Sequence, residues 1–206
     1  MRLGGIQLNE GGLGGWELCN YPANKLPEQV ATAVVKINMN LLGASYTPIR
    51  MLGTQVVNGV NYMLLAKIVR SDENHSTNIV IMVINIPAGD ITGENATLVD
   101  VINHADLPGE VQDAYDDAIG SLHGVNYNPL LYVGSQVVKG LNYYIICEAT
   151  VVYPGAIPKA VVVCINSFEG KNTIVSIEPI EAFDVEAPEV TKNTVATLGA
   201  PLGEWP

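Results

Sequence analysis

The chain has 206 residues, of which 48% are apolar and 15% charged, and its net charge is −11. This apolar content is typical of a globular protein and too high for a disordered one. The lysines and arginines are scattered, which argues against nucleic acid and anionic membrane as partners, because both bind through clustered positive charge.

The first 20 residues are rich in glycine and are predicted to form an extended arm, in which Leu13-Gly14-Gly15-Trp16 stands out. A helix is expected from Pro27 until Gly43, because a proline suits the first helical turn and apolar residues then recur at helical spacing. These apolar positions are Val30, Val34, Ile37 and Leu41. Strands are predicted at about 49–57, 60–69, 78–86 and 96–103, separated by turn residues.

The same order of elements follows a second time. Asp106 is a plausible N-cap ahead of Pro108, and Gly124 is expected to stop the second helix. The apolar stripe of this helix consists of Val111, Tyr115, Ala118, Ile119 and Leu122. Strands are predicted at about 130–138, 141–152, 159–167 and 174–183.

The two halves are copies of one another. Sliding the chain by 81 residues aligns 26–68 with 107–149 without a gap, and 15 of the 43 positions are identical. An internal repeat of this length outranks every other signal in a sequence. The prediction is an α+β protein with two domains of one fold, 1–103 and 104–184, each with a helix across a four-stranded antiparallel sheet.

A tail rich in proline and threonine, 185–206, follows the second unit. It ends in Leu202-Gly203-Glu204-Trp205-Pro206, which echoes the string around Trp16. The echo is open to three interpretations: chance, the start of a third unit, or a segment that docks back on the sheets.

Several predicted strands are apolar on both faces. The runs 79–84 and 160–165 do not alternate with polar residues, although a sheet covered by a helix on one face normally does. We therefore hypothesise that the outer faces are covered, either by stacking of the two domains or by a second chain. Solvent exposure of Ile81, Val83, Val161 and Val163 tests this hypothesis.

These apolar runs are too short to span a bilayer, and the start of the chain, Met1 to Gly5, lacks a hydrophobic signal core. The lack of a signal core slightly favours a cytoplasmic location, and secretion with removal of a signal stays open. Cys19, Cys147 and Cys164 have no zinc-ligand spacing and are expected to be buried thiols. No metal or cofactor is predicted.

The repeated string is Gln55-Val56-Val57-Asn58-Gly59 in the first unit and Gln136-Val137-Val138-Lys139-Gly140 in the second. Each copy is followed, one residue later, by Asn-Tyr. The string falls where one predicted strand turns into the next. Exposed valines at a hairpin tip would form a contact surface, whereas the alternative is that they merely end a strand.

Taken with Gly14-Gly15 in the arm, the helix from Pro27 and a second hairpin containing Ile86-Pro87, residues 11–103 resemble a cystatin of the stefin type. The resemblance implies a wedge that enters the cleft of a papain-like cysteine protease and inhibits it reversibly, without chemistry by the inhibitor. Carried over residue by residue, the protease contacts are Gly14, Gly15, Gln55, Val56, Val57, Asn58, Gly59, Ile86 and Pro87.

The second unit departs from this pattern. Lys139 adds a charge to its loop, its second hairpin has no proline, and the segment before its helix must also complete the first sheet. We expect this unit to be weak or inactive and its loop to serve the fold. A binding or packing module without inhibitory activity is the main alternative for the whole chain. An enzyme is disfavoured, because the three histidines share no motif.

Overall fold

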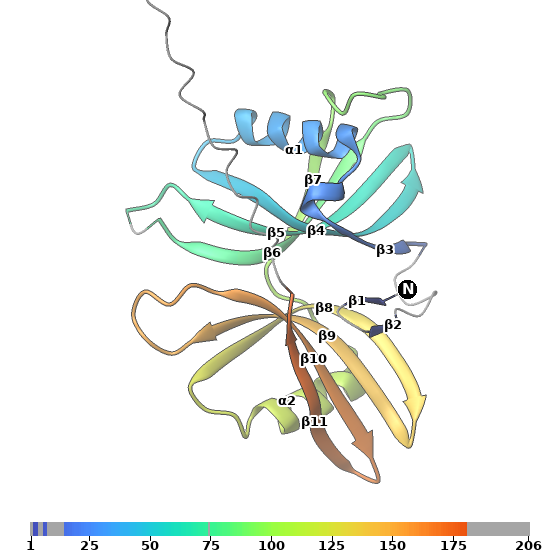
Figure 1. Cartoon of the computed structure of the whole chain (residues 1–206), viewed down its shortest axis with the longest axis vertical. Helices are drawn as coiled ribbons and strands as arrows, with labels where there is room; N and C mark the ends of the chain where they lie inside the picture. Colours follow the sequence, from blue (N-terminus) through green and yellow to red (C-terminus); the bar gives the residue numbers. More distant parts are fainter. Residues whose placement is uncertain (1, 4–5, 8–14, 74, 181–206) are drawn as a thin grey trace, which may run out of the picture.

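The computed structural model describes residues 2–3, 6–7, 15–73 and 75–180. Two antiparallel sheets lie face to face, and a helix covers the outer face of each one, as Figure 1 shows. The first sheet has the order β3-β4-β5-β6-β7 and the second the order β11-β10-β9-β8. The protein is therefore α+β, with four layers in the order helix, sheet, sheet, helix.

The first repeat, as we call the part up to β7, contains one α-helix and a five-stranded sheet. Its elements are β3 (Glu17–Pro22), a short 3₁₀ turn (Ala23–Lys25), α1 (Glu28–Asn40), β4 (Ala44–Val57), β5 (Gly59–Arg70), β6 (Thr77–Ile86) and β7 (Thr97–Ile102). A two-stranded ribbon, β1 (Arg2–Leu3) and β2 (Ile6–Gln7), precedes them.

The second repeat has one helix and four strands, as predicted. Its elements are α2 (Gly109–Ile119), β8 (Val125–Val138), β9 (Gly140–Val151), β10 (Lys159–Phe168) and β11 (Lys171–Pro179). Residues 181–183, which the sequence assigned to the last strand, lie outside the described residues.

The prediction of four strands was wrong for the first sheet. Part of the expected arm is strand β3, which pairs with β4 from Glu17 opposite Thr54 to Pro22 opposite Arg50. The strand satisfies backbone groups along the edge of β4 that would otherwise depend on water. The sequence did not reveal it because six residues with a central Cys-Asn pair show little alternation.

The predicted ends of several elements also need correction. The strands before the repeated strings begin at Ala44 and Val125, earlier than predicted, so Tyr46-Thr47-Pro48 and Tyr127-Asn128-Pro129 lie inside strands. The register shifts next to Pro48 and next to Pro129, because proline has no N–H to donate to the ladder. A bulge therefore absorbs each proline, and the strand continues past it.

The helices start one residue after their prolines and end early. Pro27 and Pro108 are the N-cap residues, so Asp106 is not a cap. Leu41 caps the end of α1, and Leu122 lies beyond α2. Gly43 and Gly124 follow the helices and have a positive φ, as a chain reversal into the next strand requires.

Each helix buries one apolar stripe against its own sheet. On α1 the buried residues are Val30, Ala33, Val34 and Ile37, and they pack over side chains of β5 and β6 such as Leu64 and Met82. On α2 the buried residues are Val111, Ala114, Tyr115 and Ala118, and they pack over β9 and β10. All three cysteines are buried and free, and burial raises the pKa of the Cys147 thiol to about 12.

A third apolar cluster lies between the sheets and takes side chains from both of them. Its members include positions 81 residues apart in the chain: Ile49 and Leu130, Leu52 and Val133, Leu65 and Ile146, Ile79 and Ala160, Ile81 and Val162. We call this group the shared cluster. Equivalent faces of the two repeats thus pack against each other, and this contact is why the strands are apolar on both sides.

Val161 and Val163 were chosen to test whether the outer sheet faces are covered, but they lie on the face of the second sheet that packs against its own helix. Val161 and Val163 are buried under α2, whereas Ala160 and Val162 face the first repeat. In a run that is apolar throughout, the sequence cannot show which alternate set faces the helix.

A buried carboxylate also crosses between the sheets. The backbone N–H of Ile79 donates to Oε2 of Glu148 at 2.6 Å, and Glu148 is buried. The equivalent position of the first repeat is Lys67, which is exposed. This hydrogen bond therefore distinguishes the two repeats and pins the start of β6 to β9.

Candidate protein-binding edge of the first repeat

The string Gln55–Gly59 forms the tip of the β4–β5 hairpin. Val57 pairs with Gly59 across the turn, and Asn58 occupies the apex. The Val56 side chain is 85% exposed and that of Val57 is 46% exposed. These two neighbouring valines, one almost fully and one about half exposed, present an apolar surface to solvent.

Gly59 joins this hairpin to the next loop. Its φ is +101°, and a Cβ at this position would lie 2.2 Å from the carbonyl oxygen of Ile86 and 2.8 Å from Cα of Pro87. A side chain would collide with backbone, which cannot move aside as the end of a flexible side chain can. Glycine here lets the first loop lie directly against the second.

A ladder of amide side chains holds the strands together just behind the tip. Asn61 Nδ2 donates to Gln55 Oε1 at 3.0 Å, and Asn85 Nδ2 donates to Asn61 Oδ1 at 2.9 Å. These residues come from β4, β5 and β6 in turn. Gln55 of the repeated string therefore has a role inside the fold, which its exposed neighbours Val56 and Val57 lack.

The arm reaches the same end of the sheet. Gly14 lies outside the described residues, whereas Gly15 is exposed with a φ of +84°. Trp16 packs against β4, with Cε3 placed 3.5 Å from where a Cβ on Gly53 would stand. Since Glu17 pairs with Thr54, continuing the register brings Gly15 level with Val56. The structure thus gathers the arm, the first loop and the second loop at one end of the sheet (Figure 1).

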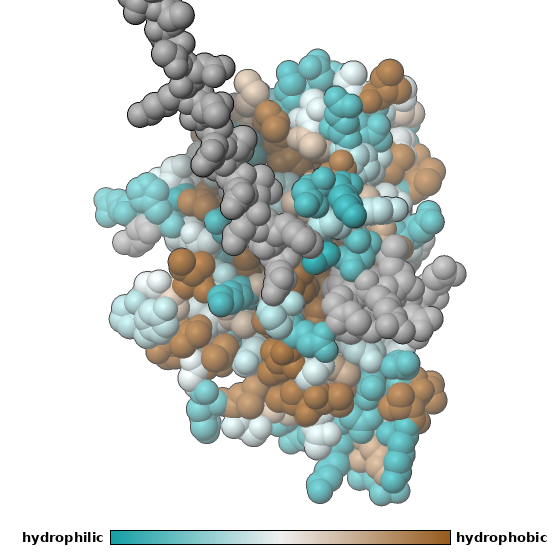
Figure 2. Space-filling model, viewed as in Figure 1, coloured by the Kyte–Doolittle hydropathy of each residue, from teal (hydrophilic) through white to brown (hydrophobic). Residues whose placement is uncertain are grey.

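The second loop, 87–96, connects β6 to β7 and presents a residue that sequence reasoning missed. Ile86 is only 3% exposed and belongs to the core under α1, and Pro87 is half-buried. Ile91, in contrast, is 84% exposed. Figure 2 shows apolar surface among polar side chains in the region of this loop, at the upper right. A lone isoleucine within a run of turn residues was the signal that could have identified it.

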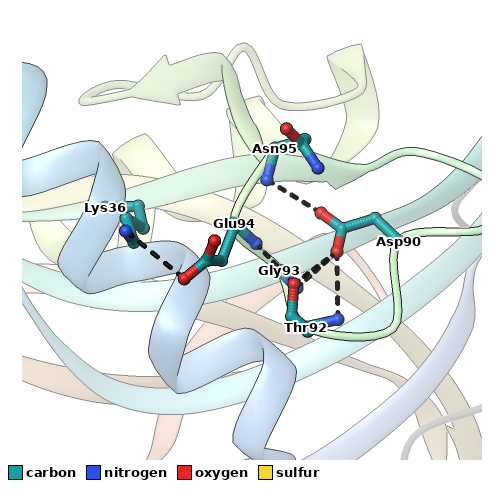
Figure 3. Close-up of polar contacts among 6 residues, drawn as sticks. All are labelled: Lys36, Asp90, Thr92, Gly93, Glu94 and Asn95. Carbon is teal, nitrogen blue, oxygen red and sulfur yellow. Dashed lines mark hydrogen bonds and ion pairs between the residues drawn. The ribbon is translucent and has the colours of Figure 1, made fainter.

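The Asp90 carboxylate organises this loop (Figure 3). Its Oδ1 accepts hydrogen bonds from the N–H and hydroxyl of Thr92 and from the Gly93 N–H, and its Oδ2 accepts one from the Asn95 N–H. These bonds, led by that from Asn95, hold the pKa of the Asp90 carboxyl well below its usual value. Glu94 forms an ion pair with Lys36 of α1 at 3.4 Å.

The loop also rests on the helix through glycine. A Cβ on Gly93, whose φ is +81°, would lie 2.0 Å from the carbonyl oxygen of Gln29. The Gln29 side chain in turn donates to the hydroxyl of Tyr62 at 2.9 Å. Tyr62 belongs to β5, which begins at the first loop. The second loop is therefore tied to α1, and through α1 to the first hairpin.

We expect the hydrogen bonds to the Asp90 carboxylate to make the stability of the protein depend on pH. The pKa of Asp90 is lowered on folding, so its contribution is present above the ordinary value of 3.8 and is lost as the pH falls below it. The gap in Tm between wild type and Asp90→Ala should be widest at neutral pH and should narrow toward about pH 2. Thermal unfolding followed by circular dichroism over this range measures it.

Asp113→Ala, at an exposed position of α2, is the matched control for removing one negative charge from an acidic protein. A gap for Asp90→Ala that stays constant with pH, or that matches the gap for Asp113→Ala, would contradict the role of the carboxylate.

The second repeat has an equivalent hairpin, but the loop beside its tip is much shorter than in the first repeat. Val137 is 82% exposed, and Gly140 contacts the backbone of Ser167 as Gly59 contacts that of Ile86. The Lys139 ammonium lies 4.9 Å above the centre of the Phe168 ring. The following turn, Glu169-Gly170, is short, because Phe168 pairs directly with Lys171.

The second repeat has no strand in the place of β3 within the described part of the chain. By the 81-residue offset, β3 corresponds to 98–103, and that segment is largely β7 of the first sheet. Gln136 also has a different partner, since it accepts a hydrogen bond from the Tyr144 hydroxyl. The first repeat alone has an arm, an apolar tip and an ordered second loop together.

No family model matches the chain, and no curated protein matches it significantly. Among the described residues, no group of His, Cys, Asp and Glu could hold a metal ion. No helix in that part of the chain is long and apolar enough to cross a membrane.

Proposed function

We propose that the chain is a reversible, non-covalent inhibitor of papain-like cysteine proteases that binds through the first repeat, as a tandem cystatin-like protein of the stefin type would. The observation that carries the proposal is the joining of three separate segments at one end of the first sheet. Gly15, the Val56-Val57 tip and the loop that starts at Pro87 reach this end, and the loop also exposes Ile91.

Some residues of the repeated string make contacts within the fold, whereas others are exposed and available to a partner. Gln55 is bonded to Asn61, and Gly59 is packed on the second loop, so both residues are explained without a partner. Val56 is 85% exposed and Val57 is about half exposed, so both present apolar surface that a partner could bury. Burying such valines in the apolar cleft of a protease would supply binding energy.

In this proposal the inhibitor carries out no chemistry. The edge would fill the cleft without offering a peptide bond to the nucleophile, so that binding remains reversible. Glycine in the arm would let the backbone approach the cleft closely. Asn58 at the apex is polar and uncharged, whereas Lys139 at the same position of the second repeat would bring a charge that must be desolvated.

A non-inhibitory binding module is the second candidate, and one observation favours it. The second repeat keeps the Gly140 contact and a hydrogen bond from Asn166 Nδ2 to Asn142 Oδ1 at 2.8 Å, although it has no strand equivalent to β3 among the described residues. The string therefore persists where a complete edge is absent, as expected if its main role is to shape a hairpin.

Titration of active papain with the purified chain tests the proposal. We expect inhibition with one protease bound per chain. Val57→Asp should raise the inhibition constant by about 100-fold or more, because a carboxylate would be buried in an apolar contact. Val138→Asp, the same change in the second repeat, should change the constant little.

Val99→Asp provides a control at an exposed valine on β7 of the same sheet. Failure of the wild-type chain to inhibit at micromolar concentration would favour the binding module. Equal losses in Val57→Asp and Val138→Asp would mean that both repeats bind protease.

A further inference from the structure

Helix α1 has a second apolar stripe on the side that faces away from its sheet. It consists of Ala31, Val35, Met39 and Leu42, which follows the helix, and we call these residues the outer stripe. Their spacing of four, four and three residues places them along one side of a helix. All four are exposed, Val35 by 57%, Met39 by 74% and Leu42 by 100%. The outermost layer of the first repeat is therefore apolar on its outward side as well (Figure 1).

The second repeat shows that the fold does not need these apolar residues. The 81-residue offset places Gln112, Asp116, Gly120 and His123 at the same positions on and after α2. This side of α2 is polar, and Gln112 Nε2 donates a hydrogen bond to Asp116 Oδ1 at 2.9 Å. Both helices nevertheless bury equivalent positions against their sheets. An exposed apolar stripe that serves no need of the fold is typical of a surface that contacts another protein.

Charge favours a second copy of this chain as the partner. The net charge of the protein is −11, so two copies repel each other at long range. Helix α1 has one acidic and one basic residue, Glu28 and Lys36, and Lys36 forms an ion pair with Glu94. Helix α2 has four acidic residues and no basic one. The outer side of α1 is therefore a neutral region through which a second copy can approach.

The outer stripe is also complementary to itself when two copies of α1 run antiparallel. Ala31 and Met39 each lie four residues from Val35. A twofold axis at Val35 therefore places the small side chain of Ala31 opposite the long side chain of Met39 on both sides of the axis. Leu42 then reaches the first turn of α1 in the other copy. Antiparallel packing also brings helix ends of opposite partial charge together.

We propose that the protein forms a dimer through the outer stripe, with the two α1 helices antiparallel and Val35 facing Val35 across the twofold axis. From Ala31 to Met39 the stripe extends about 12 Å along the helix. A contact of this length lies at the small end of protein interfaces, so the dimer has a dissociation constant on the order of 10–100 µM. The inference does not depend on protease inhibition.

Sedimentation velocity of the full chain, from about 5 µM to about 500 µM, tests the dimer. We expect the mean sedimentation coefficient of the wild type to rise with concentration toward that of a dimer. Val35→Asp should raise the dissociation constant by at least about 30-fold, because the axis would bring two carboxylates together. Aspartate already occupies the equivalent position 116 on α2, so this variant is expected to fold. A wild type that stays monomeric over the whole range would overturn the proposal.

Val99→Asp is the matched control for the added charge. Val99 lies on β7 in the same repeat and is 54% exposed, close to the 57% of Val35. This variant should dimerise as the wild type does. If Val99→Asp and Val35→Asp weaken the dimer equally, or if Val35→Asp dimerises like the wild type, the contact does not involve the outer stripe and the proposal fails.

Disulfide crosslinking determines how the two helices are arranged. The three native cysteines are buried, so an introduced surface cysteine reports on the contact. Val35→Cys should form a covalent dimer under mild oxidation with copper phenanthroline, and so should a mixture of Ala31→Cys and Met39→Cys. Met39→Cys alone should not, because the two copies of this position would lie about 12 Å apart, beyond the reach of a disulfide. Crosslinking of Met39→Cys to itself as readily as Val35→Cys would indicate parallel helices and overturn the proposed pairing.

Discussion

Replacing Ile81 by alanine should lower the free energy of unfolding by about 2–5 kcal/mol. Ile81 has no exposed surface and lies in the shared cluster, so the substitution leaves a cavity between the two sheets. The expected loss is large because the cavity is surrounded by strands on both sides, which cannot collapse into it without separating from the helices that cover them.

The same substitution should weaken the second repeat, although it lies in the first. Hydrogen exchange of amides in β9 and β10 should accelerate along with those in β5 and β6, because side chains of all four strands form one cluster. Chemical denaturation measures the total loss. Protection in β9 and β10 that is unchanged by Ile81→Ala would contradict a common core.

Val99→Ala is the matched control for this experiment. Val99 is an exposed aliphatic residue of β7 in the same sheet, and trimming it should change stability by no more than about 0.5 kcal/mol. The comparison separates loss of the shared cluster from a general effect of shortening an aliphatic side chain in this sheet.

Gly59→Ala should destabilise the protein by about 3 kcal/mol or more and should displace the two loops from one another. Two effects combine at this position. The φ of +101° is unfavourable for any L residue, and the new methyl group would collide with the Ile86 carbonyl and the Pro87 Cα. Thermal and chemical unfolding measure the loss of stability.

Gly89→Ala isolates the first of these effects. Gly89 lies in the second loop with a φ of +87°, and a Cβ there has no neighbour within 4 Å. Gly89→Ala should therefore lower the free energy of unfolding by only about 1–2 kcal/mol. If Gly59→Ala and Gly89→Ala lose the same stability, the close approach of the two loops does not contribute.

The consequence for function follows from the same geometry. Under the proposed inhibition, Gly59→Ala should weaken binding of papain more than Gly89→Ala, because it moves the first loop away from the second. Papain binding is measured at a temperature at which both variants are folded. Weaker binding in Gly89→Ala than in Gly59→Ala would favour a site confined to the second loop.

Local signals in the sequence were sufficient for the elements of each repeat. The apolar spacing from Val30 to Ile37 identified α1, and the 81-residue offset carried β4, β5 and β6 onto β8, β9 and β10. Strand ends were less accurate, because a bulge at Pro48 or Pro129 absorbs a residue that would otherwise stop a strand. Strand β3 was missed because its stability comes from its neighbour β4 rather than from its own pattern.

The sequence predicted the hairpin tip of the candidate edge correctly but identified the wrong exposed residue in the second loop. The string at Gln55–Gly59 lies at a hairpin tip with its valines exposed. Ile86, taken from the resemblance, is buried, and Ile91 is the exposed residue of that loop. Sequence spacing could not distinguish them, because Asp90 and Gly93 determine how the loop folds back on α1.

By itself the sequence determined that the protein is a duplication, that each copy contains one helix and a meander of strands, and that a Gln-Val-Val-X-Gly hairpin occurs twice. Those features follow from periodicity and identity, which are local properties of a chain. Tertiary structure alone decided which alternate residues of an apolar strand face the other sheet. It also decided that 97–102 completes the first sheet and therefore does not pair with β8 as β3 pairs with β4, because one segment cannot pair with two edges.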